Sequence, residues 1–566
     1  MTEPTNQDGT VGEAGKPAVG KTPSNRRRRL FQLAALGLIV VSGLAGTGLA
    51  WLLRPPDASD DKDPKPTGPL APYFKDWDKP EVAIVLTADQ HGYLSPCGCS
   101  EPQQGGLERR YNLIQLLKNR GWPVVAVDLG NVPQVEAPAK LPNKQGLIKY
   151  RYAMRAMKEM GYIAVGIGDF ETAMPLTRLL DEYALQEPKP RVVSADLLER
   201  DKYPDETQAW QQADPIPGSN LKIGVTAALG PSIYERVQKN NSPVKFGNSR
   251  AALTAVLQEM DAAKVDLPIL LYMGSVMQKP GGSEAEACAK AFPQFPLIVA
   301  MDDSDLARST PLWLTDPKTG AKTTMLTTLG HKAKAVGVVG VYRTGNADRP
   351  FELRYQLVEM SPDFATPAAA VKGHPIHDLM AEYAKELKDQ NYLEQYPKAM
   401  HPDQVGQDPM PKYVGTQRCA GCHAYAMKVW EGSHHAHAYQ TLVDAKLDGN
   451  PTPNRQYDAE CVVCHTVGFE YVSGFQSDKK TLKLENVGCE SCHGPGSRHY
   501  NAPDDPVFQA QMNPWKAKPD EKPEEKKARL QRIDDMCQRC HDSENDVHWT
   551  NGGFERNWPQ VEHKTP

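Results

Sequence analysis

The chain lacks a marked excess of charge of either sign. Its 566 residues include 65 lysines and arginines against 70 aspartates and glutamates, which gives a formal net charge of −5. Proteins that bind nucleic acid usually present a strongly basic face, so the composition gives no support for nucleic acid as a partner. The length is sufficient for two or three domains that each have a core.

Cysteine is scarce over the first 400 residues, where three of the 11 occur. Cys97 and Cys99 stand together in the sequence SPCGCS, and Cys288 stands in the helical pattern AEACAKAF. The close pair has two interpretations, a local loop with ordinary thiols and a redox or soft-metal site. Cys288 is expected to be a buried structural thiol.

Long hydrophobic runs are also missing, apart from one. Residues 30–53 are uncharged, follow Arg26–Arg29, and are numerous enough to cross a bilayer. The basic flank belongs in the cytoplasm. We therefore expect a disordered cytoplasmic tail at 1–29, a single-pass inner-membrane anchor at 30–53, a proline-rich linker at 54–80, and the rest in the periplasm or an equivalent space. A cleaved signal peptide is the alternative.

The other eight cysteines form four pairs in the last third of the chain, and a histidine follows each pair directly. The motifs consist of Cys419, Cys422 and His423; Cys461, Cys464 and His465; Cys489, Cys492 and His493; and Cys537, Cys540 and His541. In CxxCH the two thiols form thioether bonds to haem and the histidine binds the iron. Composition alone gives roughly 0.006 copies of this pattern in the chain.

A zinc ribbon is the competing interpretation of paired cysteines. It does not explain a histidine after every second cysteine in a chain that carries an export signal. The sequence therefore predicts four covalently bound haem c groups, which we number 1 to 4 in chain order.

Between residues 81 and 360, short apolar runs alternate with amphipathic stretches. The runs predict strands at Glu81–Ala88, Pro123–Leu129, Ile163–Ile167, Leu221–Val225, Leu267–Met273, Leu297–Met301 and Ala335–Tyr342. The stretches predict helices at Leu107–Arg120, Leu147–Met160, Arg250–Lys264 and Glu284–Ala291. This alternation is typical of a layered α/β domain. Residues 361–410 are expected to form a linker with one helix, His374–Gln390.

Asp89 and His91 follow the first predicted strand, where both side chains can reach one crevice and bind a metal. The sequences DQHG, GGLER, DLGN and GIGDFE then occur in this order. They resemble the 5′-nucleotidase branch of the calcineurin-like metallophosphoesterases, which show a DxHG strand end, a GGxAR helix start, a DxGD strand end and a GNHE turn. The resemblance covers residues 80–345.

The resemblance implies metal ligands at Asp89 and His91, and it places Asn131 and Asp169 at two further ligand positions. The remaining positions depart from the family. Phe170 stands where the family has its catalytic histidine, Met273 where it has a ligand histidine, and Met301-Asp302-Asp303-Ser304 where it has GHxH. A two-metal centre needs hard nitrogen and oxygen ligands. We therefore expect a degraded site without phosphoester hydrolysis, which could hold a single divalent metal on Asp169, Asp302 and Asp303.

In the C-terminal region, residues 411–566, the sequence WEGSHHAHA follows the first motif, and the sequence GCESCHGPGSRH contains the third. They resemble the tetrahaem cytochromes c typified by the nitrifiers' partner of hydroxylamine oxidoreductase. The resemblance implies a mainly α, haem-packed fold in which His435 and His499 bind iron from the distal side. His548 is a third distal candidate, and His434 and His437 are expected to face solvent. The family also tends to leave one haem five-coordinate, which would be haem 2 here, because no histidine follows CVVCH closely.

These patterns together predict a membrane-anchored multihaem cytochrome c that exchanges electrons with redox partner proteins in the periplasm. The α/β domain would be a docking, sensing or accessory module. Two alternatives stay open. One is a fused metal-dependent hydrolase of a phosphate or sulfur-ester substrate, coupled to the haems. The other is a reductase of small nitrogen oxides at an open haem.

Overall fold

The computed structural model describes residues 68–96, 103–184, 189–202, 207–278, 282–302, 304, 307–347, 349–444, 446–447, 450–451, 454–543, 545–546 and 548–563. The expected tail and anchor, Cys97, Cys99 and Asp303 lie outside these ranges. Within the ranges, no helix is both long enough and apolar enough to cross a membrane. The chain divides into two units, 1–64 and 65–566, and every described element belongs to the second.

Seven strands form the first sheet, in the order β13-β12-β1-β2-β3-β4-β5. They are β1 (Val82–Thr87), β2 (Val124–Asp128), β3 (Tyr162–Val165), β4 (Arg191–Val193), β5 (Thr207–Gln208), β12 (Ala335–Asn346) and β13 (Arg349–Glu359). β1 to β5 are parallel, so their carboxyl ends lie along one edge, whereas β12 and β13 run antiparallel at the other side. The metal-site residues that the sequence predicts after the first three strands lie at this edge.

Six strands form the second sheet, in the order β10-β11-β9-β8-β7-β6. They are β6 (Trp210–Gln212), β7 (Ile223–Leu229), β8 (Leu267–Ser275), β9 (Leu297–Met301), β10 (Leu312–Thr315) and β11 (Lys322–Thr327). The inner four are parallel and the two edge strands antiparallel.

Side-chain alternation along β8 explains how the two sheets are layered. Ile269, Leu271 and Met273 belong to the main core, which also contains the buried residues of β1. Leu270 and Tyr272 point the other way, into a second cluster beneath the helices α7 (Ser249–Ala262) and α8 (Glu284–Ala291). Because successive strand residues point to opposite faces, β8 is buried on both sides, which accounts for its continuous apolar sequence.

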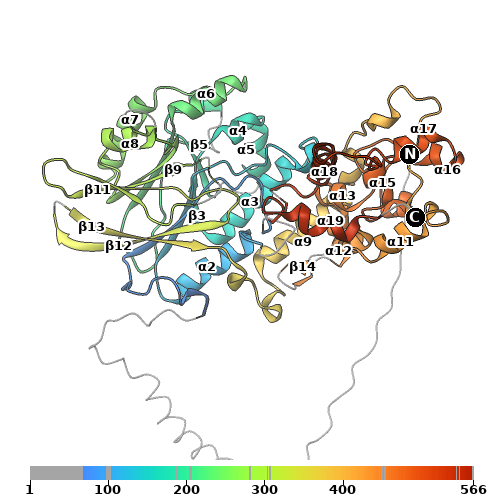
Figure 1. Cartoon of the computed structure of the whole chain (residues 1–566). Coiled ribbons are helices and arrows are strands. Elements are labelled where there is room, and N and C mark those ends of the chain that lie inside the picture. Colours follow the sequence, from blue (N-terminus) through green and yellow to red (C-terminus); the bar gives the residue numbers. More distant parts are fainter. Residues whose placement is uncertain are drawn as a thin grey trace, which may run out of the picture. The chain divides into compact units, whose positions relative to one another are not determined.

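Helices cover the outer faces of both sheets (Figure 1). They are α2 (Leu107–Asn119), α3 (Gly146–Met160), α4 (Asp169–Ala173), α5 (Leu176–Ala184), α6 (Pro231–Lys239), α7 (Ser249–Ala262), α8 (Glu284–Ala291) and α9 (Pro375–Asp389). α2 and α3 pack on the first sheet, and α7 and α8 pack on the second. The layered α/β fold expected from the sequence is therefore present.

Helix α9 differs from the linker helix expected at residues 361–410. Its apolar face, which includes Ile376, Tyr383 and Leu387, is buried in the main core. Phe364, which precedes it, is also buried there. This helix packs against α2 and α3, so it belongs to the α/β domain and does not simply connect two domains.

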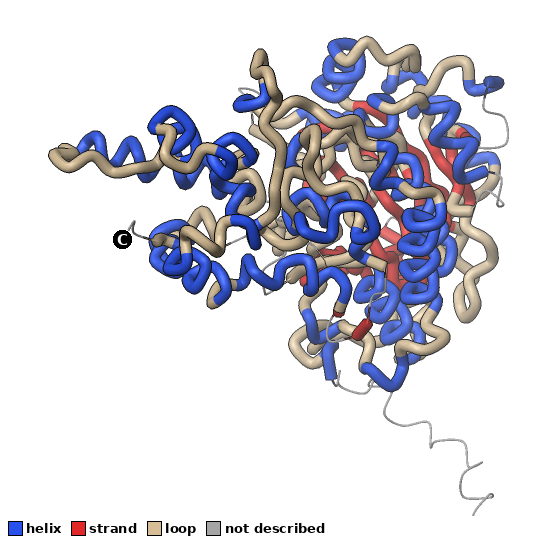
Figure 2. The backbone as a smooth tube through the Cα atoms, turned by 90° about the vertical axis from the view of Figure 1, so that its right-hand side faces the viewer, coloured by secondary structure: helices blue, strands red, loops and turns tan. Residues whose placement is uncertain are grey.

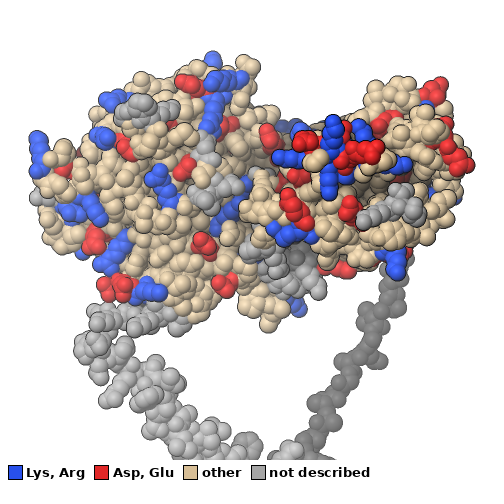
Figure 3. All heavy atoms as spheres, viewed as in Figure 1, with Lys and Arg blue, Asp and Glu red and all other residues tan. Residues whose placement is uncertain are grey.

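The C-terminal region contains short helices and loops (Figure 2). The helices are α10 (Tyr392–Gln395), α11 (Ala424–Glu431), α12 (Ala438–Val443), α13 (Ala459–His465), α14 (Asp478–Thr481), α15 (Cys489–His493), α16 (Ser497–Asn501), α17 (Pro506–Met512), α18 (Pro523–Cys537) and α19 (Gly553–Val561), with a small hairpin of β14 (Lys446–Leu447) and β15 (Asn450–Pro451). Acidic and basic side chains gather over α18 (Figure 3). Most of this helix is solvent-exposed, as expected of its highly charged sequence.

Candidate functional site

The four CxxCH motifs stand on or beside helix ends. CVVCH lies on α13, where the Asp458 side chain caps the helix by accepting from the backbone N–H of Glu460 at 3.0 Å. CESCH forms α15, CAGCH directly precedes α11, and CQRCH begins at the last residue of α18. A helical turn brings the two cysteines of CxxC to one side, which suits two thioether bonds to one porphyrin edge.

Three of the four motif histidines have the Nδ1 atom engaged in a hydrogen bond. His465 Nδ1 is 2.6 Å from the carbonyl oxygen of Ala438, and His493 Nδ1 is 2.5 Å from that of Met512. His541 Nδ1 is 2.9 Å from the carboxylate of Asp546. Metal-binding histidines typically donate the second ring N–H in this way. The arrangement leaves Nε2 available for iron.

Three motif histidines also face a second histidine ring. The ring centres are 6.0 Å apart for His423 and His499, 6.2 Å for His541 and His435, and 5.9 Å for His493 and His563. A metal–imidazole bond is about 2 Å long, so two rings that share one metal ion hold their centres about 6 Å apart. These residues therefore fit haems 1, 4 and 3, each with an iron bound on both sides.

His465 of the second motif differs. All 15 histidines lie within the described ranges, and none of their rings is paired with His465 as in the three pairs above. Of the distal candidates, His435 and His499 lie opposite motif histidines, and His563 takes the third position. The sequence had suggested His548 as a third distal ligand, without assigning it to a particular haem. Its backbone N–H donates to Asp546 at 3.2 Å.

Burial favours the neutral form of several of these histidines. It lowers the pKa of His435 to about 4, and it lowers the pKa of His465, His493 and His499 below the ordinary value. Neutral imidazole is the form that binds a metal.

Cysteine contacts between motifs indicate their spatial order. The thiols of Cys419 and Cys489 lie close enough to interact, as do those of Cys464 and Cys540. Cys492 lies close enough to Cys540 for their charges to interact. The first motif therefore adjoins the third, the third adjoins the fourth, and the fourth adjoins the second. This gives the order 1–3–4–2.

In the α/β domain, the polar residues predicted at the strand ends do come together. The side-chain N–H₂ of Asn131 donates to Asp89 Oδ1 at 3.0 Å and to Asp169 Oδ1 at 3.1 Å. Its oxygen accepts from the backbone N–H of Phe170 at 3.1 Å, which fixes the orientation of the amide. Asp89, His91 and Asn131 all have positive φ (47°, 53° and 55°), a strained conformation that concentrates at functional sites.

Apolar and basic groups complete this crevice. The Phe170 ring stacks on His91 with centres 4.3 Å apart, and Met273 is buried beside Gly130 and Gly168. Arg236 lies 3.7 Å from the carboxylate of Asp169. His331, which the sequence analysis missed, has its ring centre 4.7 Å from that of His91 and its Nε2 2.7 Å from the carbonyl oxygen of Asp302.

The crevice residues do not fit a two-metal centre. The N–H₂ of Asn131 lies between the two carboxylates, where a cation would need an oxygen ligand. Among the described residues, no group of three or more His, Cys, Asp or Glu side chains is placed to hold a metal ion. Hydrogen bonds from the Asn131 amide link Asp89 and Asp169.

Glu171 supports this crevice from below and gives a pH-dependent prediction. Its carboxylate accepts from the backbone N–H groups of Asn131, Val132 and Gly168, at 3.1, 2.9 and 2.8 Å. Burial nevertheless raises its pKa from 4.5 to about 7. The folded protein therefore keeps a proton that the unfolded chain releases, so this group's contribution to stability is lost as pH rises from 4.5 to 7.

We expect the Glu171→Gln variant to lose this pH dependence. Urea unfolding at several pH values measures it. The wild-type free energy of unfolding should fall relative to that of the variant as pH rises from 4.5 to 7. Parallel pH profiles of the two proteins would show that Glu171 does not titrate in this window.

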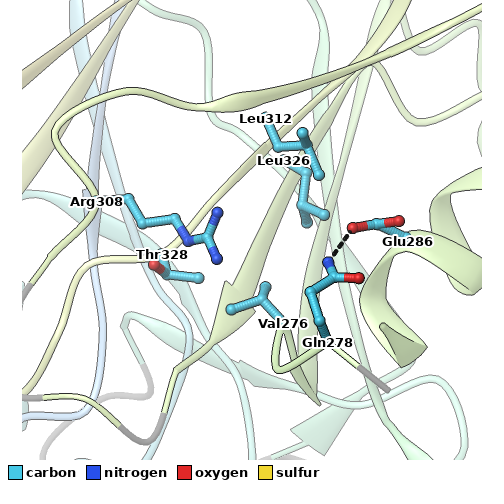
Figure 4. Close-up of a pocket in the computed structure, with 7 residues that line it drawn as sticks. All are labelled: Val276, Gln278, Glu286, Arg308, Leu312, Leu326 and Thr328. Carbon is cyan, nitrogen blue, oxygen red and sulfur yellow. Dashed lines mark hydrogen bonds between the residues drawn. The ribbon is translucent and has the colours of Figure 1, made fainter. Parts of the chain in front are cut away.

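The described residues border one hollow in the α/β domain and another beside α12. Neither of these two is an enclosed substrate pocket. A cavity of about 10 Å³ lies in the second sheet, lined by Val276, Gln278, Glu286, Arg308, Leu312, Leu326 and Thr328 (Figure 4). It has room for about one water molecule. A larger, open hollow of about 550 Å³ lies beside α12, next to His437, Gln440, Thr441 and Asp444.

Comparison with known proteins separates the two parts of the chain. Residues 418–494, which include the first three CxxCH motifs, match the family model described as cytochrome c554 and c-prime. The cytochrome c-554 of Nitrosomonas europaea is 32% identical over 136 residues, which is 23% of this chain and 57% of that protein. The chain thus spans little more than half the length of this curated relative.

Among solved structures, the 5′-nucleotidase precursor from Thermus thermophilus is 17% identical, with 62% of this chain and 67% of that chain covered and a TM-score of 0.43. The calcineurin-like phosphoesterase YfkN from Bacillus subtilis is 15% identical, with 54% and 97% covered and a TM-score of 0.40. The C-terminal region of this chain thus matches the cytochrome c554 family, and the structural neighbours of its middle region are calcineurin-like phosphoesterases of the 5′-nucleotidase type.

Proposed function

We propose that this chain is a membrane-anchored, periplasmic tetrahaem cytochrome c that transfers electrons through haems 1 to 4. The observation that carries the proposal is the set of three facing histidine pairs, each with ring centres about 6 Å apart. Haem c, when bound, supplies an iron that changes between the ferric and ferrous states by one electron. The residues of the chain hold the irons and set their potentials through ligation, hydrogen bonding and burial.

A reductive titration tests this function. The oxidised, purified chain should accept four one-electron equivalents, one for each CxxCH motif, and every haem absorption change should belong to a covalently bound group. Uptake of fewer than four equivalents by a fully loaded protein would contradict continuous transfer along the order 1–3–4–2.

Compartment and partners follow from the chemistry of attachment. Residues 30–53 and the preceding arginines support a single-pass anchor in the inner membrane, with the haem region in the periplasm. Redox proteins of that compartment are then the donor and acceptor. Proteinase added to intact spheroplasts should cleave the haem region, and protection from cleavage would contradict this placement.

The α/β domain is proposed to be a non-hydrolytic accessory module. Asn131, Phe170 and Met273 occupy positions that a hydrolytic two-metal centre would need for metal ligands or for the catalytic histidine. The rival function is a fused hydrolase of a phosphate or sulfur-ester substrate. Two stoichiometric manganese or zinc ions per chain, together with phosphoester cleavage, would favour that rival.

A second function is favoured by one observation, the absence of a facing ring at His465 among the described histidines. Without a second ligand, haem 2 would be five-coordinate and open to a small molecule. Reduction of small nitrogen oxides is the corresponding activity. Nitric oxide binding to the ferrous protein, with one equivalent per chain, tests it.

Asp546 gives a prediction for haem 4. Its carboxylate accepts from His541 Nδ1 at 2.9 Å, which raises the basicity of the ring and stabilises the ferric state. We expect Asp546→Asn to raise the midpoint potential of one low-spin haem, with a several-fold larger equilibrium constant for its reduction. Spectroelectrochemistry measures the change. Unchanged potentials for all three low-spin haems would show that this carboxylate has no such role.

A further inference from the structure

A buried polar contact joins the α/β domain to the helix that carries the second haem motif. Glu460 lies on α13, one residue before Cys461, and its Oε2 contacts Lys149 Nζ of α3. Gln134 Nε2, from the loop after β2, donates to the same oxygen at 3.3 Å. The side chains of Lys149 and Glu460 are only 13% and 8% exposed, so water screens their charges weakly.

The base of α13 is also held by the α/β domain. Gln145, at the start of α3, donates to the Asp458 carboxylate at 3.1 Å and to the Tyr383 hydroxyl at 2.9 Å, and it accepts from the Tyr396 hydroxyl at 3.1 Å. Asp458 in turn caps α13. Ala137 and Leu141 of the same loop pack with Ala459 and Val462 of α13 in one apolar cluster. The position of α13 is therefore fixed by residues of the α/β domain.

Only one oxygen of the Glu460 carboxylate is bound by polar partners. Its other oxygen, Oε1, is buried and has no hydrogen-bond partner among the described residues. The guanidinium of Arg455 lies beside the same motif and donates to Cys461 Sγ at 3.3 Å. A buried carboxylate next to a haem-bound cysteine acts on the iron through a low-dielectric medium, where one charge has a large effect.

The loop after β2, whose Gln134 donates to Glu460, also borders the crevice around Asp89 and Asn131. Asn131, which bridges Asp89 and Asp169, stands three residues before Gln134. Gln134 packs so closely on Gly92, the neighbour of His91, that an added Cβ at Gly92 would lie 2.5 Å from the Gln134 Cβ. A change in the crevice can therefore reach Glu460 through a single packed residue.

We propose that the α/β domain sets the reduction potential of haem 2, with Lys149 and Gln134 as positioning residues for the Glu460 carboxylate. The proposal rests on the proposed function, because it requires haem 2 to be bound at CVVCH. It gives the α/β domain a role in electron transfer that needs no hydrolytic chemistry. An electron added to haem 2 is disfavoured by the nearby carboxylate and favoured by the ammonium group that pairs with it.

The test is a redox titration of the full, haem-loaded chain in alkaline buffer, which favours the ionised form of the Glu460 carboxylate. The high-spin ferric signal in electron paramagnetic resonance reports haem 2 specifically, since the other three motif histidines face a second ring. We expect Glu460→Gln to raise the haem 2 potential, with about a tenfold larger equilibrium constant for reduction, which is about 59 mV for a one-electron couple. Lys149→Met should lower it, and Lys149→Arg should keep it near the wild-type value.

The matched control is Glu382→Gln. Glu382 pairs with Arg155, also on α3, at 2.7 Å, so the control removes an ion pair from the same helix without touching α13. It should leave the haem 2 potential unchanged. A wild-type potential in both Glu460→Gln and Lys149→Met would overturn the proposal. Failure of the proposed function is distinguishable, since it would appear as fewer than four covalently bound haems or as uptake of fewer than four reducing equivalents by the wild type.

Discussion

Replacing His563 by leucine should raise the high-spin share of the ferric protein from one haem in four to two in four. The His563 ring faces His493 with centres 5.9 Å apart, so it is placed to be the second ligand of haem 3. Leucine has no atom that binds iron, and loss of one axial imidazole leaves a five-coordinate, high-spin centre. Electron paramagnetic resonance of the oxidised protein, normalised to total haem, measures this share.

His548→Leu is the matched control for this experiment. His548 is the nearer histidine in sequence to the fourth motif and was the third distal candidate of the sequence analysis. The facing pairs involve His435, His499 and His563 instead, so His548→Leu should leave the high-spin share at one in four. An increase in His548→Leu and none in His563→Leu would reverse the assignment.

Removing the attachment cysteines of the second motif should have the largest effect on the haem content and on the free energy of unfolding. In the double variant Cys461→Ala, Cys464→Ala, haem content should fall from four to three per chain, and the high-spin signal should disappear. The cluster around α13, which contains Val462, Val467 and Phe469, would lose a large apolar group. We expect the free energy of unfolding to fall by about 3–5 kcal/mol, the range for removal of a large aromatic side chain from a core.

Cys288→Ala is the control for the cysteine experiment. Burial raises the pKa of the Cys288 thiol to about 12, so this thiol is unreactive and lies in no CxxCH motif. The variant should keep all four haems and the high-spin signal. A double motif variant that still holds four haems would show that CVVCH is not an attachment site.

The sequence predicted the strands that are buried on both faces better than those at or next to the edge of a sheet. β8 and β9 are continuous apolar runs, and both were predicted from that pattern. β11 has the sequence KTTMLT and β13 has RPFELRYQLVE. Both mix charged or hydroxyl side chains with apolar ones, because each is partly exposed, and neither was predicted. The short α5 and α6 were missed as well, although each has one buried apolar face.

At the candidate haem sites, the sequence likewise predicted residues in local motifs better than residues that only the fold brings together. The motif histidines and His435 stand in distinctive local patterns, so sequence alone could name them. His563 stands near the chain end in a polar sequence, VEHK, and only the fold brings it to His493. The same holds for His331, which lies far along the chain from His91 and reaches it because β12 pairs with β1.

The role of residues 361–410 also depended on contacts that sequence does not reveal. The amphipathic pattern of α9 predicted a helix, and that helix is present. The pattern does not indicate which surface the apolar face of this helix covers. In the structure it packs on α3, and its Tyr383 reaches Gln145, which is part of the contact between the α/β domain and α13.

Electron paramagnetic resonance of the oxidised, purified chain, with its haem quantified as pyridine haemochrome, tests the tetrahaem assignment most directly. We expect four haems per chain, of which three are low-spin with two histidine ligands and one is high-spin. Four low-spin haems would contradict the open site at His465, and fewer than four haems would contradict the tetrahaem assignment itself.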